Sequence, residues 1–360
     1  MIKCIKIVKG KCLVAVFLSV LMILMSACGN ENVQQANNNK KIVAGLAMID
    51  LKLPFFVRMK EAGTKAAEEY GIEVIWQSAD GSLEKQISIV ENFIEQKVDV
   101  ILIDPLDAKG IIPAIEKAKA AGIPVITMGN KVEGKWNHNT LYPDYENMAM
   151  VARSIGTALN GKGEVALLTG SAGNFVSDTR EKGFVETMKK EFPNIKIVGV
   201  QPTNFDPAQA QRITETWLNN FPNLKAIAFI SDPLGLAAMS VADAKGKKLL
   251  FGGYDGNKEM HPMIENGSMM IDVLTGAERV GYWNVAVAAR IAKGSKMPVD
   301  LYMPTYFVTS DQTATMLKNK GLTFEYITPE KAISVAQNYS EEFGPNQPDE
   351  RIIGNDDGKN

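Results

Sequence analysis

Aromatic, carboxylate and amide side chains recur directly after the short apolar runs of this sequence. Phe55 and Phe56 follow the first run, Asp104 follows the third and Asn130 the fourth. Later runs are followed by Phe205, by Ser231 and Asp232, and by Tyr254 and Asp255. Carboxylates accept hydrogen bonds from hydroxyl groups, and aromatic faces cover the C–H face of a sugar ring. Together these residues predict a mostly apolar slot with a few converging polar groups.

Each of these positions also has an ordinary structural explanation. An aspartate after a strand often caps the following helix, and a phenylalanine there often packs into the core. The repeated occurrence of such residues favours a ligand cleft, because open α/β sheets bind ligands at the carboxyl ends of their strands.

Catalytic motifs are absent from the sequence. Gly161-Lys162-Gly163 precedes an apolar run, whereas a dinucleotide-binding turn follows a strand. Residues 169–173 lack the Gly-x-Ser-x-Gly order of a hydrolase elbow. The three cysteines all lie within residues 1–28 and the chain has two histidines. We therefore expect no enzyme, no cofactor and no bound metal. An extracytoplasmic enzyme that uses a pair of the aspartates stays as the weaker alternative.

The elements that position these residues follow from the alternation of short apolar runs with longer amphipathic segments. Residues 56–70, 83–96 and 108–121 carry apolar residues at helical spacing. This alternation predicts βαβ units and parallel sheets covered by helices on both faces. The runs expected as strands are 42–49, 72–77, 98–103, 124–128, 164–169, 195–201, 226–230, 249–254 and 269–274.

So many strands do not fit comfortably in one sheet of a small domain. Residues 129–145, rich in Asn, Trp, Tyr and Pro, interrupt the alternation, so we place a crossing between two lobes there. Residues 329–339 are expected to add a helix. The polar residues from 345 to 360 are expected to be a mobile tail.

The first 28 residues have the layout of an export signal. Lysines precede an apolar run that ends at Ser26-Ala27-Cys28, and the run is too short to span a bilayer. A cysteine after Ser-Ala resembles the processing site of bacterial lipoproteins. We therefore expect a signal peptide over 1–27, a lipid on Cys28 and a flexible tether over 28–41. A cleaved signal with an unmodified cysteine is the alternative. The expected location is outside the cell membrane, anchored to it, at the cell surface or in the periplasm.

Several blocks occur in the order found in one family. Residues 54–56 (Pro-Phe-Phe), 98–105, 121–127, 170–184 and 252–256 resemble the ribose-binding-protein group of solute-binding proteins for ABC transporters. The resemblance extends from about Lys41 to Leu317. It implies the fold of periplasmic binding protein type I: two Rossmann-like parallel-sheet lobes, a hinge of three strands, and a ligand between the lobes.

This resemblance implies roles for the candidate residues. Phe55 and Phe56 would be stacking rings, Asp104 a hydroxyl acceptor and Phe205 a second aromatic wall. The implied polar residues are Asn130, Asp178, Ser231, Asp232, Tyr254, Asp255 and Thr275.

The chain departs from the ribose binders at several of these positions. They carry Asn at Leu53, Asp-Arg at Gly129-Asn130, Arg at Asp178 and Gln near Thr275. The arginine fork on the sugar hydroxyls is therefore lost, and no buried base is obvious in the cleft. We expect a ligand that is rich in hydroxyl donors or carries an amino group, and that is neither a phosphate nor a carboxylate.

The resemblance also implies the boundaries of the two lobes. The N-terminal lobe would comprise 42–143 and 276–304, and the C-terminal lobe 144–275 and 305–325. Residues 326–360 would form a C-terminal extension.

The leading interpretation is a monomeric binding module that captures a monosaccharide or related polyol and delivers it to an ABC permease. Lactose-repressor-type regulators share this body but carry an N-terminal DNA-binding segment, and an export signal stands there instead. With 39 basic and 41 acidic residues, no nucleic-acid partner is expected. A sensor for a chemoreceptor or histidine kinase, including one for a furanosyl quorum signal, would use the same lobes. The sequence does not separate transport from sensing.

Overall fold

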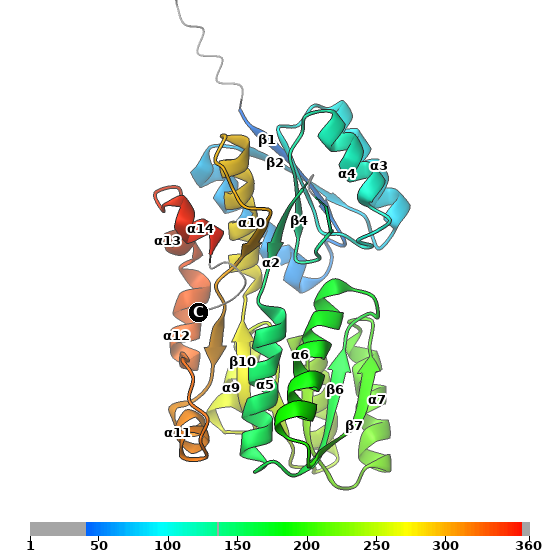
Figure 1. Ribbon diagram of the computed structural model, residues 1–360, viewed down its shortest axis with the longest axis vertical. Coiled ribbons are helices and arrows are strands. Elements are labelled where there is room, and N and C mark those ends of the chain that lie inside the picture. Colours follow the sequence, from blue (N-terminus) through cyan, green and yellow to red (C-terminus); the bar gives the residue numbers. More distant parts are fainter. Residues whose placement is uncertain (1–40, 135–136, 355–360) are drawn as a thin grey trace, which may run out of the picture. The chain divides into compact units, whose positions relative to one another are not determined.

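The computed structural model describes residues 41–134 and 137–354. The predicted signal peptide, Cys28 and the tether up to residue 40 lie outside the described residues. The folded body begins at Ile42, and within it the strands form two separate sheets (Figure 1).

The first sheet consists of six parallel strands in the order β11-β5-β4-β3-β1-β2. The strands are β1 (Val43–Met48), β2 (Glu73–Ser78), β3 (Val100–Ile103), β4 (Val125–Met128), β5 (His138–Leu141) and β11 (Asp300–Tyr302). Its helices are α2 (Pro54–Tyr70), α3 (Leu83–Glu95), α4 (Ile112–Ala120) and α10 (Ala277–Ala292). Strands β3 and β4 are buried throughout, as expected when helices cover both faces of a sheet.

The second sheet has the order β12-β10-β9-β8-β6-β7, and only β12 runs antiparallel to its neighbour. The strands are β6 (Gly163–Thr169), β7 (Ile195–Pro202), β8 (Leu224–Phe229), β9 (Leu250–Gly252), β10 (Met269–Leu274) and β12 (Tyr306–Val308). Its helices are α5 (Asp144–Ala158), α6 (Phe175–Glu191), α7 (Pro207–Asn220), α8 (Asp232–Ala244), α9 (His261–Glu265) and α11 (Asp311–Asn319). A 3₁₀ turn, η1 (Lys258–Met260), precedes α9.

The predicted alternation of strands and helices is therefore confirmed, and each of the nine predicted runs contains a strand. Strands β5, β11 and β12 were not predicted. They have three or four residues, and β5 reads His-Asn-Thr-Leu, so they lack the apolar run by which the longer strands are recognised.

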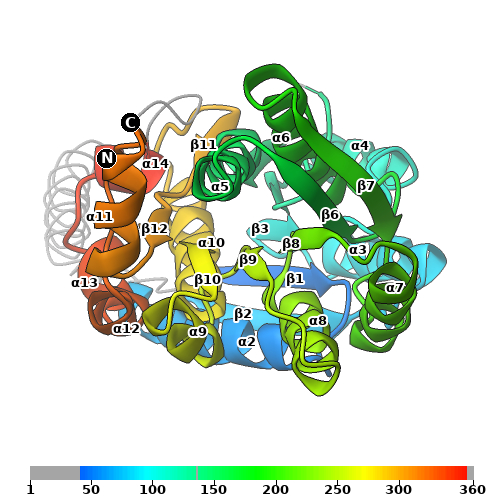
Figure 2. The same ribbon diagram turned by 90° about the horizontal axis from the view of Figure 1, so that it is seen from below.

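Glycine allows the closest helix contacts in each lobe. A Cβ atom on Gly281 of α10 would lie 2.0 Å from the Met59 carbonyl oxygen of α2, and one on Gly183 of α6 would lie 2.2 Å from the Tyr145 carbonyl oxygen of α5. No side chain fits at such distances, so the two helix pairs pack backbone against backbone. Figure 2 shows α5 beside α6.

The chain passes between the two sheets in three places. These lie between β5 and β6, between β10 and β11, and between β11 and β12. Helix α5 packs on β9 and β10, and α10 packs on α2. The fold class is therefore as predicted, and the lobe boundaries given above stay a prediction.

The C-terminal residues differ from expectation. The predicted helix at 329–339 is present as α12 (Pro329–Gln337), and α13 (Tyr339–Phe343) and α14 (Asp349–Ile353) follow it. The prediction of a mobile tail from residue 345 is wrong as far as residue 354, because Ile352 is fully buried and its carbonyl accepts a hydrogen bond from Trp283 Nε1 at 2.8 Å. The polar composition of the tail concealed this one apolar anchor. Residues 355–360 lie outside the described part.

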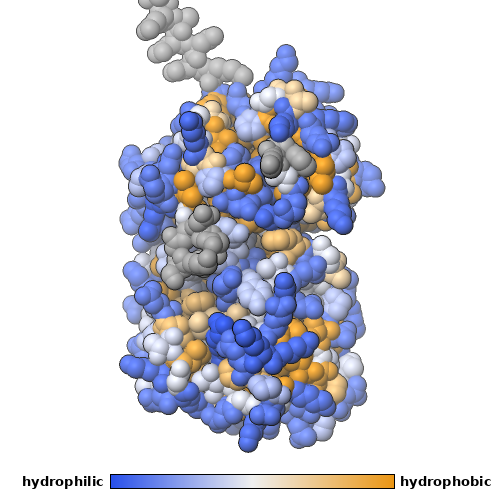
Figure 3. Space-filling model, viewed as in Figure 1, coloured by the Kyte–Doolittle hydropathy of each residue, from blue (hydrophilic) through white to orange (hydrophobic). Residues whose placement is uncertain are grey.

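The surface seen in Figure 3 is mainly hydrophilic, with apolar residues in small groups. Such scattered groups are ordinary on protein surfaces. Among the described residues, no helix is long and apolar enough to cross a membrane.

Candidate functional site

The loop after β3 holds the first polar candidate, Asp104. Gln86 of α3 fixes this loop, because its side-chain amide donates to the Asp104 carbonyl at 2.6 Å and its oxygen accepts from the Leu106 N–H at 3.0 Å. The Asp104 carboxylate accepts a hydrogen bond from Asn130 Nδ2 at 3.1 Å. Burial raises the pKa of Asp104 to about 7, and the Asn130 hydrogen bond opposes this rise. Asp104 can therefore exchange a proton near neutral pH.

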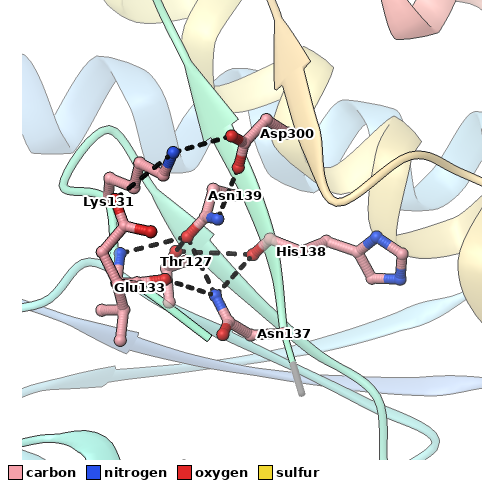
Figure 4. A network of polar contacts seen from close by, with 8 residues as sticks. Thr127, Lys131, Glu133, Asn137, His138, Asn139 and Asp300 are labelled. Atoms are coloured by element: carbon pink, nitrogen blue, oxygen red, sulfur yellow. Dashed lines mark hydrogen bonds and ion pairs between the residues drawn. The ribbon is translucent and has the colours of Figure 1, made fainter. Parts of the chain in front are cut away.

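Asn130 lies on the loop after β4. A polar network around Asn139 and Asp300 holds the neighbouring part of this loop in place (Figure 4). Asn139 of β5 accepts from the Val132 N–H at 3.1 Å and from Thr127 Oγ1 at 2.5 Å. It donates to Asp300 of β11 at 2.7 Å, and Lys131 Nζ donates to the same carboxylate at 2.8 Å. The two short strands thus fix the loop that carries Asn130. Asn130 also faces the second lobe, since its Oδ1 accepts from the Val176 N–H at 3.4 Å.

In the second lobe, the candidate residues surround a buried base, Arg180 of α6. Arg180 is 5% exposed, its Nε donates to Asp144 at 2.7 Å and its Nη1 donates to the Ile230 carbonyl at 2.7 Å. The same Nη1 lies 3.6 Å from Asp255 Oδ1. The expectation of no obvious buried base is therefore wrong. Arg180 lies inside α6, and only the fold brings it beside Asp255.

Arg180 also stacks on Tyr254. The guanidinium carbon lies 3.4 Å from the ring centroid, a cation–π arrangement. Burial alone would lower the pKa of Arg180, but Asp144, Tyr254 and Asp255 raise it above its ordinary value. The Tyr254 hydroxyl accepts from Asn147 Nδ2 at 2.8 Å. Because Tyr254 is fully buried, its structural role is to hold Arg180.

Asp255 is the best-placed carboxylate of this lobe. Its Oδ2 accepts from Ser231 Oγ at 2.7 Å and from the Asp232 N–H at 3.2 Å. Burial raises its pKa, while Arg180 and the Ser231 hydrogen bond oppose that rise. Its φ of 121° lies in a region that L-residues rarely adopt. Such backbone strain is often found at functional sites.

Asp232 is placed differently from Asp255. It is fully buried, and its Oδ2 accepts from the Asn257 N–H at 2.7 Å. Its other partner is Asp272 of β10, also fully buried. Burial and the neighbouring carboxylates raise the pKa of both groups. Asp232 therefore anchors the loop at Asn257.

The aromatic candidates come from both lobes. Phe55 and Phe56 at the start of α2 are half-buried, with ring centroids 5.4 Å apart and planes at 88°. Phe205 is 39% exposed and has a φ of 59°. Its ring lies directly on Gly170, where a Cβ atom would come within 2.2 Å. The ring thus has an exposed face available for a ligand.

Thr275 lies beside Asp255, because its N–H donates to the Asp255 carbonyl at 3.3 Å, and Asp178 lies in the first turn of α6. Asp178 is exposed and accepts a hydrogen bond from the Gly173 N–H at 3.2 Å. Thr275 is 3% exposed, and its carbonyl accepts from Arg279 Nη1 at 2.9 Å. These contacts are local to α6 and to the chain crossing after β10.

A hollow of about 380 Å³ lies elsewhere, between Arg58, the 256–261 loop, Glu278 and α12. None of the candidate residues lines it. In the described part of the chain, no group of three or more His, Cys, Asp or Glu side chains could hold a metal ion.

The geometry therefore offers two carboxylates, Asp104 in one lobe and Asp255 in the other, together with exposed aromatic faces. Arg180 is already committed to Asp144 and a carbonyl. Where carboxylates line a site and the basic side chain is already paired, hydroxyl or ammonium donors bind more favourably than anions.

The comparisons with known proteins agree with this fold. Residues 44–296 match the family model described as the periplasmic binding protein domain. The chain is 30% identical over 297 residues to the ribose import binding protein RbsB of Bacillus subtilis, which covers 81% of this chain and 96% of that protein. It is 25% identical over 314 residues to the xylitol-binding protein of Mycolicibacterium smegmatis, covering 85% and 86%.

A solved structure is also similar. It is an ABC transporter periplasmic solute binding protein from Actinobacillus succinogenes with bound D-allose. It has a TM-score of 0.71 and 26% identity, and the match covers 77% of this chain and all of the other. The class defined by the fold is thus an extracytoplasmic binding protein of two α/β lobes. The chain belongs to the periplasmic binding protein family, type I, as the resemblance implied. RbsB and the protein from Actinobacillus succinogenes are binding proteins of import systems, not enzymes.

Proposed function

We propose that this protein captures a neutral polyhydroxylated ligand, a monosaccharide or related polyol, between its lobes and delivers it to an ABC permease. The single observation that carries the proposal is that each lobe holds a carboxylate hydrogen-bonded to a polar side chain, Asp104 to Asn130 in one and Asp255 to Ser231 in the other. A ligand that bonds both carboxylates would favour the closed arrangement of the lobes.

The ligand chemistry follows from the partners already present. Ribose, xylitol and D-allose, named for the relatives, are neutral and rich in hydroxyl groups. An amino group on the ligand would suit Asp255 as well. A phosphate or carboxylate would face these carboxylates without a free base, which is unfavourable.

The proposed ligand-binding residues are those of the sequence prediction, and we divide them into three sets by the contacts described above. We propose direct ligand contacts for Phe55, Phe56, Asp104, Asn130, Phe205, Ser231 and Asp255. We propose supporting roles for Asp232, Tyr254 and Thr275, and a place at the rim for Asp178.

The remaining parts of the proposal concern location and assembly. A lipid on Cys28 would retain the protein at the membrane, with residues 28–41 as a tether. The protein would act as a monomer without catalytic activity. The sensor alternative is not favoured, because the relatives named above are import proteins.

The experiment is a thermal-shift screen of residues 29–360 against pentoses, hexoses, deoxysugars, amino sugars, cyclitols and furanosyl compounds. A ligand at about one hundred times its dissociation constant adds roughly 2.7 kcal/mol of stability. A rise in melting temperature confined to one sugar class supports the proposal. If only acidic ligands raise it, the proposed ligand chemistry is wrong.

Ligand affinity is expected to depend on pH through Asp104. With a pKa of about 7, Asp104 is mostly protonated at pH 6 and mostly ionised at pH 8. If hydroxyl donors require the carboxylate, the dissociation constant falls about tenfold from pH 6 to pH 8, since it scales inversely with the competent fraction. Titration calorimetry at both pH values measures this. The Asp104→Asn variant is the control and should bind more weakly with little pH dependence; an unchanged pH dependence in that variant would assign the effect to another group.

A further inference from the structure

The C-terminal segment, residues 326–354, begins on the second lobe. The Ile327 N–H donates to the Phe307 carbonyl at 2.8 Å, and the Thr309 N–H donates to the Ile327 carbonyl at 3.1 Å. Ile327 thus extends the second sheet beside β12. Helix α12 follows, and its Ala332 is buried in the core of this lobe.

The same segment ends on the first lobe. Phe343 of α13 and Ile352 of α14 are fully buried in the core of that lobe. The Phe343 carbonyl accepts from Tyr70 Oη at 2.6 Å, and the Gln347 carbonyl accepts from Arg290 Nη2 at 2.6 Å. Both donors lie on α2 or α10, so this half of the segment is fixed to the N-terminal lobe.

The segment therefore joins the lobes a fourth time. Helix α12 ends at Gln337 and α13 begins at Tyr339, so Asn338 lies between the half that begins on the second lobe and the half that ends on the first. Both halves also touch the other lobe, since α12 packs on α10 and Glu342 accepts from Tyr306 Oη of β12 at 3.1 Å. Figures 1 and 2 show α12 and α13 one after the other along one side of α9 and α10. The hollow of about 380 Å³ lies beside this link and is lined by both lobes and by Ala332, Gln337 and Tyr339.

Glu342 of α13 connects this segment to the other crossings. It accepts from Arg279 Nη2 at 2.7 Å and from Arg279 Nε at 2.9 Å. Arg279 is fully buried and also donates to the carbonyls of Thr275 and Pro304, each at 2.9 Å. Thr275 lies at the crossing after β10 and Pro304 at the crossing between β11 and β12. A bidentate arginine–carboxylate pair has a fixed geometry. Glu342 therefore orients the Arg279 guanidinium, which is hydrogen-bonded to both crossings.

We propose that residues 326–354 form a strap that limits how far the two lobes open, and that Glu342 is a positioning residue which acts on the hinge through Arg279. Lobe closure in binding proteins occurs by rotation at a few hinge residues. Here the strap contacts both lobes on either side of Asn338, so it must follow or resist that rotation. Removing this constraint widens the range of opening without touching the ligand site. The inference rests on the proposed function only for the use that the protein makes of the strap. The opening of the lobes itself can be measured without ligand.

The test inserts a flexible Gly-Ser linker of about six residues between Gln337 and Asn338, which leaves both packed halves of the strap intact. Spin labels on the exposed positions Lys119 and Glu215, one on each lobe, report the distance between the lobes in the full folded part. The matched control carries the same linker between Gly246 and Lys247, in an exposed turn of the second lobe. The variant Glu342→Gln tests the positioning role separately.

The insertion at residue 337 is expected to make the distance distribution about twice as wide, towards longer distances, and the control is expected to match the wild type. Glu342→Gln should shift the distribution in the same direction by less. Distributions that coincide for wild type, control and both strap variants would overturn the proposal. If the insertion prevents folding, the Glu342→Gln variant is the test. A shift of its distance distribution towards longer distances supports the proposal, and a distribution that coincides with the wild type overturns it. Because the readout needs no ligand, its failure leaves the proposed sugar binding untouched.

Discussion

Replacing Arg180 with methionine is expected to lower the free energy of unfolding by about 3–5 kcal/mol. The substitution keeps most of the side-chain volume but removes the partner of Asp144, which is 2% exposed. It also frees the Ile230 carbonyl and removes the group stacked on Tyr254. A single buried charge without its partner is costly, and this cost explains the size of the effect. Urea denaturation of the purified variant at pH 7 measures it.

Arg153→Met is the matched control. Arg153 makes a similar pair with Glu191, with Nη2 2.7 Å from Oε1, but both side chains are about one-third exposed. Surface pairs contribute about 0–1 kcal/mol, so the control should lose little. If both variants lose the same amount, the burial of Arg180 does not decide its contribution.

The pH dependence of Arg180→Met gives an independent check. Burial raises the pKa of Asp144, and Arg180 opposes this rise, so its removal should raise the pKa further. The folded state then binds a proton that the unfolded state has released above about pH 4. Stability of the variant relative to wild type should therefore fall as the pH rises from 5 to 8. A loss that is constant over this range would argue against an unpaired Asp144.

Replacing Asp255 with asparagine is expected to weaken ligand binding by about tenfold to a hundredfold, since a hydrogen bond to a charged group contributes about 1.5–3 kcal/mol. The side chain keeps its shape, so the walls of the site stay in place. The dissociation constant, measured by titration calorimetry with the sugar that gives the largest thermal shift, is the readout.

Asp178→Asn is the control for this substitution, because Asp178 is exposed and bonded to a local N–H. The dissociation constant of the Asp178→Asn variant should stay within about twofold of the wild-type value. This change is well below the one expected from losing a hydrogen bond to a charged group. A larger loss from Asp178→Asn than from Asp255→Asn would restore Asp178 to the centre of the site and contradict the assignment made here.

Much of the fold could be predicted because its buried strands are continuous apolar runs. The run at 98–103, for example, contains a strand that is buried at every position. The short strands β5 and β11 could not be recognised, because His138, Asn139 and Asp300 are polar residues whose side chains make hydrogen bonds.

The candidate site could be predicted only in part. Position after a strand identified Asp104 and Asp255, since all parallel strands end at the same edge of a sheet. Arg180 lies within a helix, and nothing in its local sequence indicates that it faces Asp255. The carboxyl pair of Asp232 and Asp272 was also not predicted, because it joins a helix start to a strand interior. Contacts between such distant positions depend on tertiary packing, which local patterns do not report.

The packing of the strap at the C-terminus could not be predicted from local sequence patterns either. Phe343 and the pair Ile352-Ile353 stand in an otherwise polar stretch, so their spacing indicates no amphipathic helix. Their burial depends on Trp283 and on neighbouring residues of α10, far away in the sequence.

Titration calorimetry with the sugar or polyol that gives the largest thermal shift, at pH 8, tests the central claim most directly. The wild type is compared with the double variant Asp104→Asn/Asp255→Asn. The account predicts one ligand per chain for the wild type and a loss in the double variant close to the product of the two single losses, about a hundredfold or more. Binding that is equally tight in both proteins would show that the ligand does not bind between these two carboxylates, and the account would be contradicted.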